Sequence, residues 1–178
     1  KGSTPKTSMN TQIEYKRRKL SDEEVSTLVT EIQNAPHITY VRPFMFKLRK
    51  DGIIATENGK LCGVCSFYDL GGGWVKLGPL FVLEKYRSHG IGSTLLSKAI
   101  NLTKDKNIYV GSSRDSLKKL NQELGFNEIK PLQLPFRVIL FFTFYLIVSV
   151  TSIKFWRETI RKAKIYSKRK YKHFVREG

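Results

Sequence analysis

The alternation of apolar and polar residues divides the first 130 positions into short strands and amphipathic helices. Apolar, partly β-branched runs bounded by turn residues predict strands, and apolar residues three and four apart predict helices. Residues 52–83 form an antiparallel meander in this prediction, and the helix after them leads to a parallel strand. The sequence therefore predicts an α+β domain in which a mixed sheet is flanked by helices. Strands are expected at 11–20, 52–57, 61–68, 75–83 and 107–110, and helices at 21–33, 91–102 and 116–124.

Three local signals predict where these elements begin and turn. Ser21 followed by Glu24 is a capping box, which opens the first helix, and Asn58-Gly59 is a strong signal for a hairpin turn. Pro79 has no backbone N–H and therefore predicts a bulge or an edge in the strand at 75–83. The expected apolar face of the first helix consists of Val25, Leu28, Val29 and Ile32.

The stretch from Val75 to Leu102 carries the clearest chemistry. A buried strand is followed by the turn Arg87-Ser88-His89-Gly90-Ile91-Gly92 and then by an amphipathic helix. Two glycines at a strand-to-helix turn let a ligand approach the backbone N–H groups, and the helix N-terminus adds a partial positive charge. The turn is therefore expected to bind phosphate. A dinucleotide-binding turn would need a third glycine where this chain has Leu95. The expected inner face of the helix consists of Ile91, Leu95, Ala99 and Leu102.

This order of strand, Arg-x-x-Gly-x-Gly turn and helix resembles the pyrophosphate loop of the GNAT superfamily of acetyl-CoA-dependent N-acetyltransferases. The resemblance runs from about Glu14 to Lys130 and includes Leu124-Gly125-Phe126 after the last predicted helix. Two family positions differ, because the usual Tyr before that glycine is Asn121 and the usual Asn at the helix entrance is Arg114. The family's Tyr commonly protonates the departing CoA thiolate, and an Asn side chain is not an acid of that kind.

The resemblance implies where acetyl-CoA, the expected co-substrate, would bind. Its pyrophosphate would lie on backbone N–H groups of the turn, and its pantetheine would pair like an added strand at the splay between the two central strands. The N–H of Val82 would then stabilise the thioester oxyanion. No metal is expected. The expected cofactor-binding residues are Phe81, Val82, Leu83, Arg87, Ser88, His89, Gly90, Ile91, Gly92 and Ser93.

The sequence leaves the catalytic acid and base open. Tyr68, Asp69 and Glu84 are candidate bases by position, although such residues are more often ordinary polar groups at strand ends and in loops. Asn121 is a further weak candidate, because it stands at the family's Tyr position. The histidines at 37 and 173 have no partner pattern and are expected to be structural or surface residues.

The two cysteines, Cys62 and Cys65, lie three residues apart in a predicted strand. That spacing places them on opposite faces of a regular strand, which disfavours a disulfide or a metal pair. Reduced core cysteines favour the cytoplasm. No apolar signal segment is visible in the first forty residues, which favours the same compartment.

The C-terminal part of the chain differs in composition from the rest. Residues 138–153 contain no charged residue and no Gly, Pro, Asn or Asp that would form a hairpin turn, which predicts a single apolar helix. It would reach about 24 Å, which is short of a hydrocarbon core of ~30 Å. Residues 154–178 follow with ten Lys or Arg and two Glu, in a chain whose net charge is +17. An apolar helix with a basic tail predicts association with the inner, anionic face of a membrane. The alternatives are a buried C-terminal helix or strand that covers the sheet, or a dimer contact.

The predicted organisation is a disordered start at 1–10, a GNAT domain at 11–133, and an apolar segment with a basic tail at 134–178. The expected function is acetyl transfer to a primary amine of an unidentified small molecule or protein. One alternative is a non-catalytic, membrane-tethered acyl-CoA-binding module, which Asn121 favours. A nucleic-acid binder that stacks Tyr166, Tyr171 and Phe174 on bases is a second alternative, disfavoured because the tail has no recognisable motif. The oligomeric state is not predicted.

Overall fold

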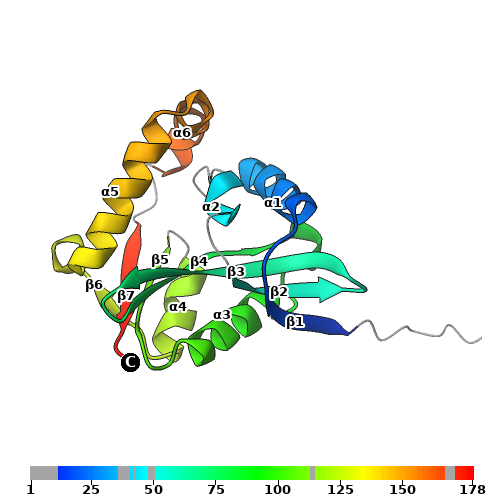
Figure 1. Ribbon diagram of the computed structural model, residues 1–178, viewed down its shortest axis with the longest axis horizontal. Helices are drawn as coiled ribbons and strands as arrows, with labels where there is room; N and C mark the ends of the chain where they lie inside the picture. The colour runs from blue at the N-terminus through cyan, green and yellow to red at the C-terminus, as the bar shows by residue number, and fades with distance from the viewer. Residues whose placement is uncertain (1–11, 36–40, 42, 48–50, 113–114, 167–170) are drawn as a thin grey trace, which may run out of the picture.

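A seven-stranded sheet with helices on both faces organises the chain (Figure 1). The computed structural model describes residues 12–35, 41, 43–47, 51–112, 115–166 and 171–178. The predictions of a disordered start at 1–10, and those for His37 and Arg114, fall outside these residues.

The sheet has the strand order β1-β2-β3-β4-β5-β7-β6. Neighbouring strands run antiparallel, except that β4 and β5 are parallel. The predicted mixed sheet, the meander and the parallel crossover are therefore confirmed. The strands are β1 (Ile13–Arg18), β2 (Gly52–Glu57), β3 (Lys60–Gly71), β4 (Trp74–Val82), β5 (Asn107–Ser112), β6 (Asn127–Ile129) and β7 (Lys172–Arg176).

One face of the sheet is covered by α3 (Ile91–Leu102) and α4 (Asp115–Glu123) (Figure 1). The predicted bounds of α3 are confirmed, but Leu102 was wrongly assigned to its inner face and is 50% exposed. A helix turns 100° per residue, so the buried stripe is instead widened by Leu96 and Ile100. The residues of α3 that enter the core are Ile91, Leu95, Leu96, Ala99 and Ile100.

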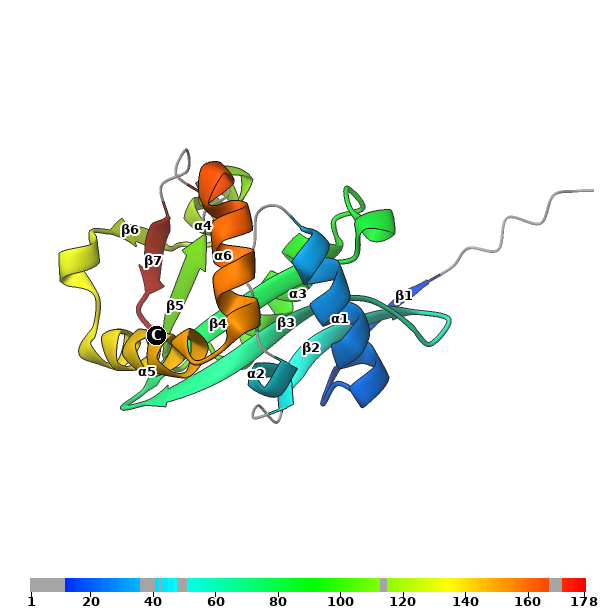
Figure 2. The same cartoon turned by 90° about the horizontal axis from the view of Figure 1, so that it is seen from above.

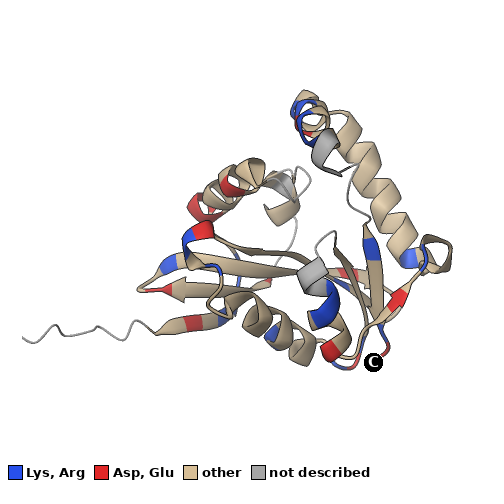
Figure 3. Ribbon diagram, turned by 180° about the vertical axis from the view of Figure 1, so that it is seen from behind, with Lys and Arg blue, Asp and Glu red and all other residues tan. Residues whose placement is uncertain are grey.

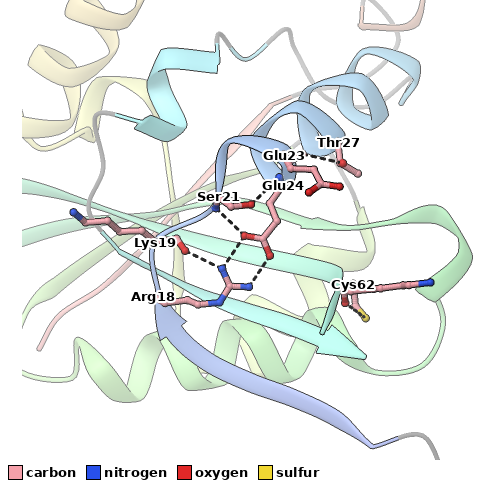
Figure 4. A network of polar contacts seen from close by, with 8 residues as sticks. Arg18, Lys19, Ser21, Glu23, Glu24, Thr27 and Cys62 are labelled. Atoms are coloured by element: carbon pink, nitrogen blue, oxygen red, sulfur yellow. Dashed lines mark hydrogen bonds and ion pairs between the residues drawn. The ribbon is translucent and has the colours of Figure 1, made fainter. Parts of the chain in front are cut away.

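The other face is covered by α1 (Asp22–Asn34), α2 (Pro43–Lys47) and α5 (Phe136–Val150). All four apolar residues predicted for the inner face of α1 are buried. The capping box of α1 is formed, since Ser21 and Glu24 exchange hydrogen bonds. Arg18 adds a two-pronged ion pair to Glu24, with N···O distances of 2.7 and 2.6 Å (Figure 4). The end of β1 is thereby tied to the start of α1.

The predicted single helix at 138–153 is instead two helices. α5 ends at Val150, and α6 (Ile153–Tyr166) begins after a bend of 105°. The missed signal is Ser152, whose hydroxyl accepts a hydrogen bond from the N–H of Phe155 and so caps α6. Among the described residues no single helix is long and apolar enough to cross a membrane, whereas the bent pair passes that test of length and composition when taken together.

Both helices contact the rest of the domain, α5 at β3 and α6 at α1 (Figure 2). Phe141 of α5 packs edge-on against Tyr68 of β3, with ring centroids 5.2 Å apart. Lys162 of α6 is buried and donates a hydrogen bond of 3.0 Å to the carbonyl of Ile32, near the end of α1. Carbonyls at a helix C-terminus favour such a cation. One side of α5 is therefore part of the core, as the alternative interpretation of this segment expected.

The C-terminal residues, which were predicted to be part of a basic tail outside the domain, include a strand of the sheet. β7 lies between β5 and β6 in the sheet, and its Phe174 is 1% exposed within the core. This strand of the sheet thus comes from residues 134–178, which were predicted to lie outside the GNAT domain. α5 and α6 form a connection between two strands of one sheet.

The two cysteines are free and buried, but they do not lie on opposite faces. Both belong to the core cluster beneath α3. The register between β2 and β3 shifts between Ala55 and Thr56, which pair with Gly63 and Leu61. Cys62 is the extra residue of this bulge, and a bulge resets the alternation of side chains.

Candidate active site

The two central strands, β4 and β5, separate partway along their length. They pair only from Trp74 with Asn107 to Leu77 with Val110, while β4 continues to Val82 alongside β3. The register between β3 and β4 shifts between Phe67 and Cys65, opposite Gly78 and Pro79. The predicted irregularity at Pro79 is confirmed, and it stands where the splay begins.

Val82 turns its backbone groups into this splay. The N–H of Leu83 donates to the carbonyl of Cys62 on β3, at 2.9 Å. Successive residues of a strand direct their backbone groups to opposite edges, so the N–H and the C=O of Val82 face away from β3. The Val82 carbonyl accepts a hydrogen bond of 3.1 Å from the Nε of Arg87. The N–H of Val82 thus faces the gap between the two strands.

The turn after β4 exposes several backbone N–H groups at the start of α3. Ser88 and Gly90 both have positive φ values, of 67° and 72°, and Gly90 is the N-cap of α3. The first four N–H groups of a helix have no acceptor within it, and here they belong to the glycine-rich turn. A Cβ built on Gly92 would meet the side chain of Val82 at 3.6 Å, which is ordinary contact. Gly92 is therefore not required by packing within the chain.

The side chains of the expected cofactor-binding residues differ in their exposure to solvent. Phe81 and Leu83 are buried, so these two residues offer only backbone groups to a ligand. Ser88 and His89 are exposed. Arg87 is half-buried, and its guanidinium lies 5.6 Å from the centre of the Phe81 ring. Arg87 therefore links the turn to β4.

The candidate bases from the sequence lie in three different settings. Tyr68 is 2% exposed beneath α5, with the Nζ of Lys76 4.8 Å from its ring centre. Asp69 forms an ion pair of 2.8 Å with Lys106. Glu84 is exposed in a short 3-10 turn, Glu84–Tyr86, after β4. The structure does not bring these three side chains together.

Asn121 lies on α4 and is completely buried. Neither polar atom of its side-chain amide has a hydrogen-bonding partner among the described residues. An unsatisfied buried amide costs about 1–3 kcal/mol. This unfavourable free energy arises at the position where the family has its Tyr.

A hydrogen-bonded pair that the sequence analysis missed lies beside the splay. The hydroxyl of Tyr109 on β5 is 2.8 Å from Nδ1 of His173 on β7. Tyr109 is completely buried, and burial raises the pKa of its hydroxyl and lowers that of His173 below its usual value. No spacing pattern joins two residues so far apart in sequence. They meet because β7 pairs with β5.

Comparison with known proteins agrees with this geometry. The model of the acetyltransferase (GNAT) family matches residues 18–126, which is more than half of the chain. No curated protein matches the sequence.

Solved structures with a similar fold include three acetyltransferases of low sequence identity. N-acetylglutamate synthase from Neisseria gonorrhoeae, in complex with coenzyme A and N-acetyl-glutamate, is 14% identical with a TM-score of 0.64. The match covers 93% of this chain and 35% of the synthase, so the chain spans about a third of that protein's length.

A GNAT-family acetyltransferase from Staphylococcus aureus is 22% identical, with a TM-score of 0.57, over 68% of this chain and 90% of that one. The ribosomal-protein-S18-alanine N-acetyltransferase from Escherichia coli is 20% identical, with a TM-score of 0.56, over 66% and 80%. At these identities the likeness concerns the fold, and the family follows from the family model. The chain belongs to the acetyltransferase (GNAT) family.

Proposed function

We propose that this chain is an N-acetyltransferase that transfers the acetyl group of acetyl-CoA to a primary amine. The observation that carries the proposal is the splay between β4 and β5, with the N–H of Val82 facing it and a glycine-rich turn at the start of α3 shortly after it. Coenzyme A is present in the structure of the Neisseria synthase, which has the same fold. The acceptor is a small molecule or a protein.

In this proposal the pyrophosphate lies on the backbone N–H groups from Ser88 to Ser93. The pantetheine occupies the unpaired edge of β4 and bonds to the backbone of Val82. Arg87 already bonds to the Val82 carbonyl, so its proposed role is to hold the turn in place as well as to add positive charge. The orphaned amide of Asn121 fits a site that a polar ligand completes.

The chemistry proposed for this site is direct attack by the amine on the thioester carbonyl. A backbone N–H such as that of Val82 stabilises the oxyanion without reorganising. Asn121 can donate a hydrogen bond but has no proton to release near neutral pH. The departing thiolate therefore takes its proton from water or from another group.

Calorimetric titration with CoA, followed by thiol release from acetyl-CoA with a panel of amines, tests the proposal. Binding at micromolar CoA together with amine-dependent thiol release supports it. Binding without thiol release for any amine would favour the non-catalytic acyl-CoA-binding alternative. Absence of CoA binding, with a gel shift of nucleic acid that weakens with salt, would favour the nucleic-acid alternative.

We further propose that the outer surface of α5 and α6 rests on the inner face of a membrane, with the enzyme in the cytoplasm. Figure 3 shows α5 without charged residues along nearly its whole length, and basic residues on α6 beside it. Two anchoring signals, an apolar surface and cations near anionic lipid, reinforce each other. The large apolar side chains exposed on this surface are Phe136, Ile139, Leu140, Phe144, Leu146, Ile147, Val150, Ile153, Trp156 and Ile160.

Vesicle flotation of the full chain tests this second proposal. The chain is expected to float with vesicles that contain phosphatidylglycerol and to float less with pure phosphatidylcholine. Ile139→Asp with Ile147→Asp should abolish flotation, whereas the matched control Leu102→Asp, on α3 at 50% exposure, should not. Equal flotation of all three proteins, or a stable dimer that the double substitution breaks, would contradict it.

A further inference from the structure

The face of the sheet beneath α5 carries a cluster of three titratable groups at the mouth of the splay. Tyr109 points to this face, since its ring lies edge-on to Phe142 of α5 with centroids 5.8 Å apart. Val110 is the last residue of β5 that pairs with β4, so Gly111 is the first residue of β5 at the splay. On its other side Gly111 pairs with His173 of β7. Gly111 thus separates the splay from the histidine.

Two tyrosine hydroxyls meet above Gly111. A Cβ built on Gly111 would collide with the hydroxyl of Tyr171 and would stand 2.8 Å from that of Tyr109. The two hydroxyls are hydrogen-bonding partners of each other. The glycine therefore makes room for a polar chain that runs from Tyr171 through Tyr109 to Nδ1 of His173, where the last distance is 2.8 Å.

The surroundings of these three polar side chains are mostly uncharged. α5 contributes the ring of Phe142 and, near Tyr171, the hydroxyl of Tyr145. Residue Ile129 of β6 pairs with His173. Lys76 of β4 is paired with Tyr109 in the sheet, and its ammonium lies over the rings of Tyr68 and Phe141.

Burial keeps His173 neutral at neutral pH, because desolvation lowers its pKa below 6.5. The unprotonated ring is therefore the main form above that lowered pKa. The neutral ring of His173 can therefore accept a proton near neutral pH, where acetyl transfer would be measured.

We propose that Tyr171, Tyr109 and His173 conduct the proton of the attacking amine away from the splay; this inference rests on the proposed acetyltransferase function. As the amine nitrogen bonds to the thioester carbon, its proton passes to the Tyr171 oxygen and the Tyr171 proton passes to Tyr109. The Tyr109 proton then bonds to Nδ1 of His173, which becomes an imidazolium and later releases a proton to solvent. The C–S bond breaks and the CoA thiolate leaves, so charge and atoms balance. Tyr171 would touch the substrate, whereas Tyr109 and His173 would act through Tyr171.

Three variants test the relay, with thiol release measured from acetyl-CoA using spermidine, tyramine or water as acceptor. His173→Gln removes the final base, and Tyr171→Phe and Tyr109→Phe each remove one hydroxyl but keep the ring. Each is expected to lower kcat about 100-fold, as for loss of acid–base catalysis, and to move the rising limb of the pH–rate profile upward by at least one unit. The double variant His173→Gln/Tyr171→Phe should be no slower than the slower single variant, because both break one chain.

Gly111→Ala provides a test that alters no titratable group. Its methyl group would displace the Tyr171 hydroxyl, so the variant should reproduce the pH profile of Tyr171→Phe. Tyr15→Phe on β1, at the far edge of the sheet, is the matched control and should leave kcat and the profile unchanged. A tautomer measurement by ¹⁵N NMR adds a readout without turnover. In the wild type His173 should carry its proton on Nε2, and Tyr109→Phe should release that preference.

Failure of the relay and failure of the proposed function give different results. If calorimetry detects no CoA binding, or none of the three acceptors releases thiol above the uncatalysed rate, the proposed function and the relay both fall. If the wild type is active and binds CoA but His173→Gln keeps its kcat and pH profile, the relay alone is wrong. A loss of activity with an unshifted profile in all variants would show a structural role and overturn the relay as well.

Discussion

Phe174 provides the sharpest test of the fold, because the sequence pattern placed it in a basic tail outside the domain. In the structure it lies on β7, paired with Val110 on one side and Glu128 on the other, and is 1% exposed. Replacing such a side chain by Ala removes its transfer free energy and leaves a cavity, at a cost of about 3–5 kcal/mol. A protein of this size loses roughly 2–4 °C of Tm per kcal/mol, so Phe174→Ala should lower Tm by about 10 °C.

Thermal unfolding of the full chain measures Tm, and urea unfolding followed by both fluorescence and circular dichroism measures the free energy of unfolding. Phe136→Ala is the matched control, since Phe136 is 72% exposed and its loss should change the free energy of unfolding by at most ~0.5 kcal/mol. If Phe174→Ala costs less than about 1 kcal/mol, or no more than the control, β7 is not an integral strand. The placement of α5 and α6 between two strands of one sheet would then be refuted.

Three other outcomes follow from particular side chains. Gly92→Val should abolish CoA binding by calorimetry and leave the unfolding curve almost unchanged, because a Cβ there meets only Val82 at 3.6 Å within the chain; unchanged affinity would exclude the turn as the phosphate site. Asn121→Leu should raise the free energy of unfolding by about 1 kcal/mol or more, since it removes two buried polar atoms that have no partner among the residues the structure describes. It should lower turnover by much less than ~100-fold, and a larger loss with CoA affinity kept would assign Asn121 a direct role. The hydrogen bonds from Arg18 hold the pKa of Glu24 below 4.5, so the stability that the Glu24 carboxylate adds is present above its unfolded pKa and is lost as pH falls through the folded value. Glu24→Gln should therefore lower the midpoint of urea unfolding at pH 7 but much less near pH 3. Equal decreases of the midpoint at both pH values would contradict the argument.

Local chemistry was enough to predict most of the domain up to Phe126. The capping box at Ser21, the hairpin turn at Asn58-Gly59 and the glycine turn before α3 all depend on residues within a few positions of one another. Backbone stereochemistry and helix capping decide such features, so a short window of sequence suffices. The same holds for the irregularity at Pro79, which lacks an N–H for the ladder.

Composition misled where the tertiary structure overrides it. Residues 154–178 read as a basic tail, since charge is visible in the sequence while strand pairing across the sheet is not. The burial of Phe174 depends on the pairing of β7 with β5 and β6, and Lys162 of α6 contacts the end of α1, which lies far away in the sequence. The apolar run of α5 could not show by itself which of its sides packs on the sheet.

The mixed sheet, the glycine-rich turn before α3 and the likeness to the family could be inferred from the sequence, because each rests on local patterns. In contrast, the pairing of the last five-residue strand with β5 and β6, and the contact between Tyr109 and His173, became visible in the folded chain. The physical reason is that strand pairing joins residues 64 positions apart through backbone groups that every residue carries. The side chains that meet across such a pairing can be identified only once the strand order is known.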